Sequence, residues 1–136
     1  MSEHGYSGTP LWRKLGLKEN YRLLLVSVPS NYQSLISPIP AGLQLSTRFR
    51  SQVDIVHAFV TKKAALVQAL GRGERVMKRD GAIWISWPKR ASGVPSEVTE
   101  DTIREVALPR GLVDIKVCAV DATWSGLKLV IRKENR

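Results

Sequence analysis

The sequence is poor in the residues that build disulfides and metal centres. Its 136 residues include one cysteine, Cys118, and two histidines, His4 and His57. A single cysteine excludes an internal disulfide and fits a reducing compartment. Two histidines far apart in the sequence, with one cysteine, do not offer the ligand set of a zinc site. We therefore predict no metal centre.

Long apolar runs and common catalytic motifs are also missing. No run is long enough to cross a bilayer, and MSEHGYSGTP at the N-terminus lacks the basic region and apolar core of a secretion signal. We therefore expect a cytoplasmic protein without a membrane contact. No G-x-S-x-G segment occurs, and G-R-G-E at 71–74 lacks the ending of a phosphate-binding loop. We interpret that segment as the end of a helix.

Positive charge is what the chain has in excess. The formal net charge is +9, from 21 Lys and Arg against 12 Asp and Glu. Such an excess favours anionic partners, among them nucleotides and nucleic acid. The basic residues are spread along the chain, and no arginine-rich tract or aromatic RNA-binding motif occurs. A basic surface without a specific partner therefore remains the alternative.

The apolar pattern predicts alternating strands and helices after a turn-rich arm. Apolar or alternating runs predict strands at 21–29, 43–49, 53–60, 81–88, 112–121 and 127–133. Four helices are expected: one ended by Gly16, one within 31–40, one capped by Thr61 and ended by Gly71 or Gly73, and one capped by Thr99. ATWSG at 122–126 suits a hairpin turn, with Gly126 available for a positive φ.

This order of elements predicts a three-layer α/β fold. Strands alternating with helices form a mostly parallel sheet covered by helices on both faces. Since no helix separates the last two strands, they form an antiparallel hairpin. We predict an arm at 1–20 and one domain at 21–136. A parallel sheet that ends in a hairpin resembles a shortened class I methyltransferase fold, and this resemblance implies the strand order 2-1-3-4-6-5.

Two departures argue against S-adenosylmethionine, the cofactor that this resemblance implies. Methyltransferases of this fold place a glycine-rich turn after the first strand, whereas this chain has VPSNYQ at 28–33. They also place an acidic residue after the second strand, which here ends Arg48-Phe49-Arg50. We therefore disfavour S-adenosylmethionine as a cofactor.

Ligands of open α/β sheets bind outside the carboxyl ends of the strands. Two basic pairs are expected at this edge, and we predict that they bind an anion with the help of a nearby serine: Lys62, Lys63, Lys89, Arg90 and Ser92. The first pair begins a helix, where the dipole disfavours cations and an anion would relieve the conflict. Supporting residues at the same edge are Ser30, Asn31, Trp87, Asp121 and Trp124. The alternative is two solvated surface pairs.

Several of these residues also have a purely structural interpretation. His57 lies within an apolar strand and is expected to be a hydrogen-bonded core histidine. Trp84 is expected to pack in the core, whereas Trp87 either lines a pocket or covers the edge of the sheet. Asp121 either orients a ligand or caps the hairpin turn. Cys118 is expected to be buried and inert.

Four segments together resemble an uncharacterised bacterial family of unknown function. They are GYSGTPLWRKLG (5–16), ISWPKRASG (85–93), TEDTIREVALPRGLVD (99–114) and KVCAVDATWSGLKLVIRKENR (116–136). The resemblance spans nearly the whole chain and implies a single small domain. It supplies no catalytic residues.

Three functions remain open at this point. The first is a small non-catalytic or regulatory domain that binds an anionic small molecule, such as a nucleotide, at the strand ends. The second is a divergent methyltransferase-like enzyme. The third is a module that binds nucleic acid or protein, with the N-terminal arm available for forming a homodimer.

Overall fold

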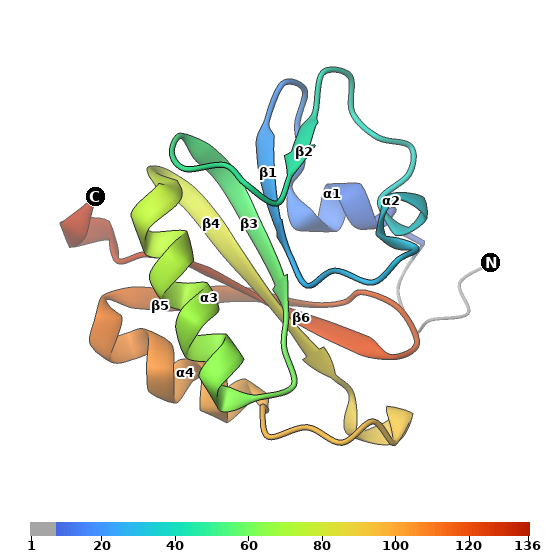
Figure 1. Cartoon of the computed structure of the whole chain (residues 1–136), viewed down its shortest axis with the longest axis vertical. Coiled ribbons are helices and arrows are strands. Elements are labelled where there is room, and N and C mark those ends of the chain that lie inside the picture. The colour runs from blue at the N-terminus through green and yellow to red at the C-terminus, as the bar shows by residue number, and fades with distance from the viewer. Residues whose placement is uncertain (1–7) are drawn as a thin grey trace.

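A computed structural model describes residues 8–136 as one six-stranded sheet with helices on both faces (Figure 1). The strands are β1 (Arg22–Val26), β2 (Gln44–Ser46), β3 (Val53–Phe59), β4 (Met77–Pro88), β5 (Leu112–Ala119) and β6 (Trp124–Ile131). The α-helices are α1 (Leu11–Leu15), α2 (Tyr32–Leu35), α3 (Lys63–Val76) and α4 (Glu100–Ala107). The strand order is β2-β1-β3-β4-β6-β5, which confirms the predicted topology.

The sheet is parallel on one side and antiparallel on the other. β1 pairs in parallel with β2 and β3, and β3 pairs in parallel with β4. β6 is antiparallel to both β4 and β5, so β5 runs in the same direction as β4. The carboxyl ends of β1 to β5 therefore lie at one edge of the sheet.

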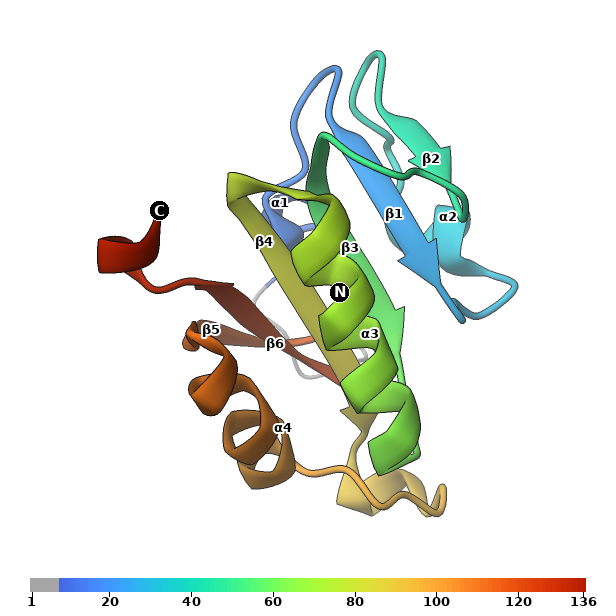
Figure 2. The same ribbon diagram turned by 60° about the vertical axis from the view of Figure 1, so that its left-hand side comes forward.

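The two faces of the sheet pack against different helices, because side chains alternate along each strand. One face, with Val56 and Ile85, packs under α3 and α4 and is mostly aliphatic. The other face, with Ile55 and Trp84, packs under α1 and α2 and includes several aromatic rings. Figure 2 shows α3 and α4 together in front of the sheet, with α1 behind it.

Helix α3 is longer than the sequence pattern predicts. It continues through Gly71 and Gly73 to Val76, so the expected end at these glycines was wrong. A Cβ at position 73 would lie 2.7 Å from Cδ1 of Ile83, so this glycine lets the helix approach the sheet closely. The N-cap is Lys62 and not Thr61. At α4 the prediction is confirmed, because Thr99 and Thr102 form a capping box.

The expected role of Gly126 was also wrong. This residue lies within β6, opposite Ser86 and Cys118, and not in the hairpin turn. A Cβ at this position would lie 3.2 Å from the Trp84 ring, so the glycine makes room for that tryptophan. The turn is closed instead by Val120, whose backbone N–H donates to the Trp124 carbonyl at 2.9 Å.

The predicted arm contributes to the core as far as the structure describes it. Gly16 ends α1 with a φ of 78°, and Leu15 and Leu17 are buried against the sheet. The indole N–H of Trp84 donates to the Leu15 carbonyl at 3.0 Å. Residues 1–7, which include part of the GYSGTPLWRKLG segment, lie outside the described residues. Within residues 8–136, no helix has the length and apolar character needed to span a membrane.

Candidate functional site

The basic pair at the start of α3 is neutralised by carboxylates of the chain. Lys62 Nζ lies 3.9 Å from Glu97 Oε2, and Lys63 Nζ lies 3.2 Å from Glu105 Oε1. The second Glu97 oxygen accepts the backbone N–H of Lys63 at 3.0 Å. Glu97 therefore provides the negative charge that the helix dipole favours at this position. Its own backbone N–H donates to the Thr61 carbonyl at 2.8 Å, which fixes it there.

The second basic pair follows β4 and is built differently. The backbone N–H of Lys89 donates to the Thr123 carbonyl at 2.7 Å, which joins this loop to the hairpin. The Ser92 hydroxyl donates to the Lys89 carbonyl at 2.6 Å, and Gly93 adopts a φ of 76° that closes the short 3₁₀ turn. Among residues 8–136, no carboxylate forms an ion pair with Lys89 or Arg90.

A pocket of about 470 Å³ lies between the end of β4 and the start of α4. Its lining is part apolar and part polar: Trp87, Pro88, Arg90, Gly93, Val94, Ser96, Val98, Thr99 and Glu100. Trp87 is 9% exposed and belongs to the aliphatic core, so it both packs and lines the pocket. In the sequence, the Thr99 cap indicates where α4 begins after the loop that follows β4.

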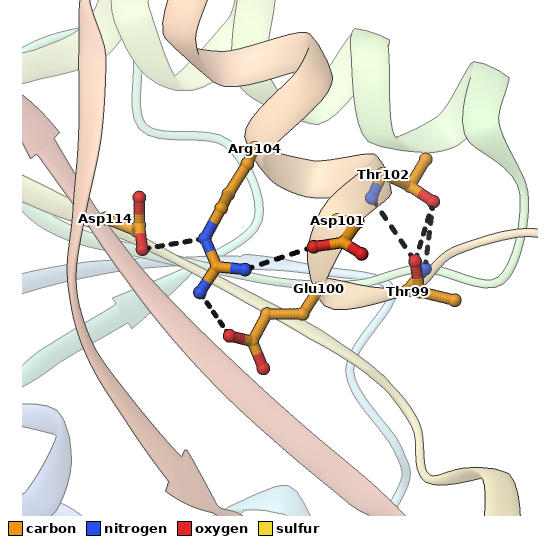
Figure 3. Close-up of polar contacts among 6 residues, drawn as sticks. All are labelled: Thr99, Glu100, Asp101, Thr102, Arg104 and Asp114. Atoms are coloured by element: carbon orange, nitrogen blue, oxygen red, sulfur yellow. Dashed lines mark hydrogen bonds and ion pairs between the residues drawn. The ribbon is translucent and has the colours of Figure 1, made fainter.

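Glu100 is the acidic residue in this lining, and Arg104 compensates its charge. Figure 3 shows Arg104 among three carboxylates, those of Glu100, Asp101 and Asp114. Arg104 lies 3.3 Å from Asp101 and 3.0 Å from Asp114, and it also pairs with Glu100. The hydrogen bonds that the guanidinium donates to Asp114 and Glu100 raise its pKa. Arg90 is thus the pocket's uncompensated charge.

The supporting residues do not gather in this pocket. Ser30 and Asn31 are exposed before α2 and do not line it. Asp121 caps the hairpin turn, because its Oδ1 accepts the backbone N–H groups of Thr123 at 2.9 Å and Trp124 at 2.8 Å. The Trp124 ring lies 5.0 Å from Phe59 in an edge-to-face contact on the aromatic side of the sheet. The structure therefore joins Trp87 and Arg90 in one pocket, flanked by Lys89 and Ser92.

His57 is part of a buried hydrogen-bonded chain. Its Nδ1 lies 2.7 Å from the Tyr32 hydroxyl, and its Nε2 lies 2.7 Å from the Ser86 hydroxyl. All three side chains are buried, and burial lowers the pKa of His57 to about 3 and raises that of Tyr32. The histidine is therefore neutral, and the chain is closed to solvent. This geometry matches the expected core histidine.

The residues that would have to hold S-adenosylmethionine do not fit that cofactor. The turn after β1 contains Val28, Pro29 and Ser30 where a cofactor needs close backbone approach, and no glycine lies in it. The end of β2 offers Thr47 and Arg48 and no carboxylate for the ribose. Within residues 8–136, no cluster of three His, Cys, Asp or Glu side chains could hold a metal.

A protein family matches residues 44–133, and its description is "Protein of unknown function (DUF3052)". The chain belongs to this family. The match confirms the prediction of a family of unknown function and includes β2 to β6 with the whole β4–α4 pocket. No curated protein sequence matches the chain.

Several solved structures that share the fold of this DUF3052 protein are methyltransferases. A SAM-dependent methyltransferase from Aquifex aeolicus has a TM-score of 0.67 at 14% identity, over 89% of this chain and 88% of that one. A putative type 11 methyltransferase from Sulfolobus solfataricus has a TM-score of 0.59 at 11% identity, over 83% and 84%. The B. subtilis M1A22 tRNA methyltransferase TrmK has a TM-score of 0.54 at 9% identity, over 96% and 66%. At these identities the likeness establishes the fold alone, and it confirms the predicted methyltransferase-like fold.

Proposed function

We propose that this DUF3052 protein is a small non-catalytic or regulatory domain that binds a phosphate-bearing small molecule, such as a nucleotide, at the carboxyl edge of its sheet. The observation that carries the proposal is the pocket between β4 and α4. There Arg90 has no carboxylate partner among the described residues, while the one acidic side chain in the lining is paired with Arg104. A guanidinium in such a position favours bidentate binding of a phosphate.

The other groups at this pocket suit the rest of such a ligand. Trp87 and Val98 provide apolar contact area, and the hydroxyls of Ser96 and Thr99 offer polar contacts. Lys89 is held beside the pocket by its hydrogen bond to Thr123 and adds a second positive charge. Lys62 and Lys63 take a different part in the proposal, because Glu97 links them to the loop that walls the pocket. They position that loop and do not contact the ligand.

A thermal-shift screen with nucleotides and phosphorylated metabolites tests this proposal. A ligand that binds only the folded protein raises Tm. We expect a rise of several degrees when the ligand concentration is well above Kd. Lys89→Gln/Arg90→Gln should remove the rise, and Lys133→Gln, an exposed lysine near the C-terminus, should keep it. The proposal would be wrong if no anion raised Tm, or if Tm rose equally in both variants.

A divergent methyltransferase is the second candidate, and the shared fold is the observation that favours it. That function requires S-adenosylmethionine to bind near the turn after β1, where the residues do not suit it. Equilibrium dialysis with labelled S-adenosylmethionine separates the two candidates. We expect no binding at millimolar cofactor, and saturable binding would favour the enzyme instead.

A further inference from the structure

A second positively charged surface lies away from the candidate site, between α3 and the loop that follows β2. A groove of about 520 Å³ is formed there, and its lining is rich in arginine: Thr47, Arg48, Phe49, Arg50, Arg72, Arg75 and Val76. We call this surface the arginine groove. Arg48 and Arg50 come from the loop, and Arg72 and Arg75 come from the last turns of α3.

The loop that carries Arg48 and Arg50 is held in place from both sides. It contains no helix and crosses in front of β1 on its way to β3 (Figure 2). The Arg22 guanidinium lies 4.1 Å from the centre of the Phe49 ring and donates to the Ser51 carbonyl at 3.3 Å. From the opposite side, the Arg72 guanidinium donates to the Thr47 carbonyl. The two exposed arginines of the loop are therefore presented on a fixed backbone.

None of the four groove arginines has an acidic partner among residues 8–136. Glu74 is the carboxylate beside them in the sequence, and Arg110 holds it at 2.8 Å. Four like charges around one groove repel one another. A bound ligand with several negative charges would relieve that repulsion. Their planar guanidinium groups match phosphate oxygens in particular.

The groove is separate from the pocket at the end of β4. Lys62 and Arg72 are ten positions apart along α3, which corresponds to about 15 Å of helix. The first of these lies at the carboxyl edge of the sheet, and the second lies near the opposite edge, because α3 runs antiparallel to β4. The two lining sets share no residue. A ligand at one site therefore does not fill the other.

We propose that the arginine groove binds the phosphate backbone of a double-stranded nucleic acid and does not read its sequence. Arginines from two elements suit consecutive phosphates better than one small anion. A single strand would instead need aromatic rings for its bases. The one ring in the lining, Phe49, is only half-buried but already stacks against Arg22.

Fluorescence anisotropy with the full chain and labelled 20-base-pair duplexes of RNA and of DNA tests this proposal. At about 0.1 M salt, Arg48→Gln/Arg50→Gln should weaken binding roughly tenfold and lower the salt slope by about two, since each lost phosphate contact changes it by about one. Arg75→Gln should lower the slope by about one. Two duplexes of unrelated sequence should bind equally.

The matched control is Arg13→Gln/Lys133→Gln, which removes the same charge from exposed positions outside the groove. Its affinity should stay within about twofold of the wild type, because long-range charge alone is screened at this salt. Equal losses in the control and groove variants would overturn the proposal. So would tighter binding of single-stranded poly-U than of the duplexes, or the absence of duplex binding. Circular dichroism verifies that each variant is folded.

Discussion

The two ends of α3 carry similar basic residues in opposite electrostatic settings. At its start, Lys62 and Lys63 are paired with Glu97 and Glu105. Near its end, Arg72 and Arg75 join Arg48 and Arg50 around a groove in which no described carboxylate forms an ion pair with them. The same helix thus has one neutralised end and one uncompensated end.

This difference shows that counting basic residues does not locate a binding surface. Seven acidic side chains take part in the ion pairs of the described residues: Asp54, Glu74, Glu97, Glu100, Asp101, Glu105 and Asp114. Three of them surround the single guanidinium of Arg104 (Figure 3). The excess positive charge is therefore concentrated on surfaces that these acids do not reach, among them the arginine groove and the Lys89–Arg90 turn.

The largest expected effect concerns how the free energy of unfolding changes with pH. It tests whether the surface ion pairs or a buried group control that change. Burial lowers the pKa of His57 to about 3, whereas the unfolded chain takes up that proton near pH 6.5. The free energy of unfolding should therefore be level above pH 6.5. It should fall by about 1.4 kcal/mol per pH unit below that, until the pH nears 3. Urea unfolding between pH 7 and pH 5 measures this slope.

His57→Gln should flatten that slope, and Arg104→Met should keep it. Surface ion pairs each contribute little to stability, so the loss of Arg104 should change the slope little. If the slope survived in His57→Gln and disappeared in Arg104→Met, the surface pairs and not the buried histidine would control the acid response. The surface ion pairs would then contribute more to stability than we infer from comparing the two ends of α3.

A smaller effect separates a compensated arginine from an uncompensated one. Arg104→Met leaves the carboxylates of Glu100, Asp101 and Asp114 close together without a cation, so Tm should fall. Arg75→Met removes one of four mutually repelling charges, so Tm should stay the same or rise slightly. Scanning calorimetry at low and high salt measures both. A larger drop in Tm for Arg75→Met than for Arg104→Met would show that the groove arginines stabilise the fold and do not serve ligand binding.

The smallest effect comes from removing part of the compensating charge at the start of α3. Glu97→Gln removes the carboxylate that pairs with Lys62 and accepts the backbone N–H of Lys63, whereas Glu105 still pairs with Lys63. Because the pair is exposed, the loss of stability should be about 0.5 kcal/mol. The variant should also bind a multivalent anion such as pyrophosphate more tightly than the wild type, by calorimetric titration. Unchanged anion affinity would show that Glu97 does not occupy an anion position.

Much of the fold could be predicted because strand and helix patterns are local. Runs such as 53–60 and 81–88 predict strands whatever packs on them, and the resemblance to a methyltransferase fold implied the correct strand order. The roles of Gly73 and Gly126 could not be predicted, since each glycine makes room for a side chain distant in sequence, Ile83 and Trp84 respectively. Local patterns suggested a helix end and a turn instead.

The candidate site was predictable only in part, because charge pairing is a tertiary property. The strand-end rule gave the position of Lys89 and Arg90 beside a pocket. It could not show that Glu97, more than thirty residues from Lys63, lies at the start of α3. Nor could it show that Arg48 and Arg50 meet Arg72 and Arg75 across one groove.

We propose that the β4–α4 pocket binds a phosphate-bearing ligand, on a methyltransferase-like fold whose turn after β1 does not suit S-adenosylmethionine. Calorimetric titration of the full chain with a nucleoside triphosphate and with S-adenosylmethionine, repeated on Lys89→Gln/Arg90→Gln, tests both parts of this proposal. We expect the wild type to bind the triphosphate, the variant to lose that binding, and neither to bind S-adenosylmethionine. Binding of S-adenosylmethionine, or equal triphosphate binding in the wild type and the variant, would overturn the proposal.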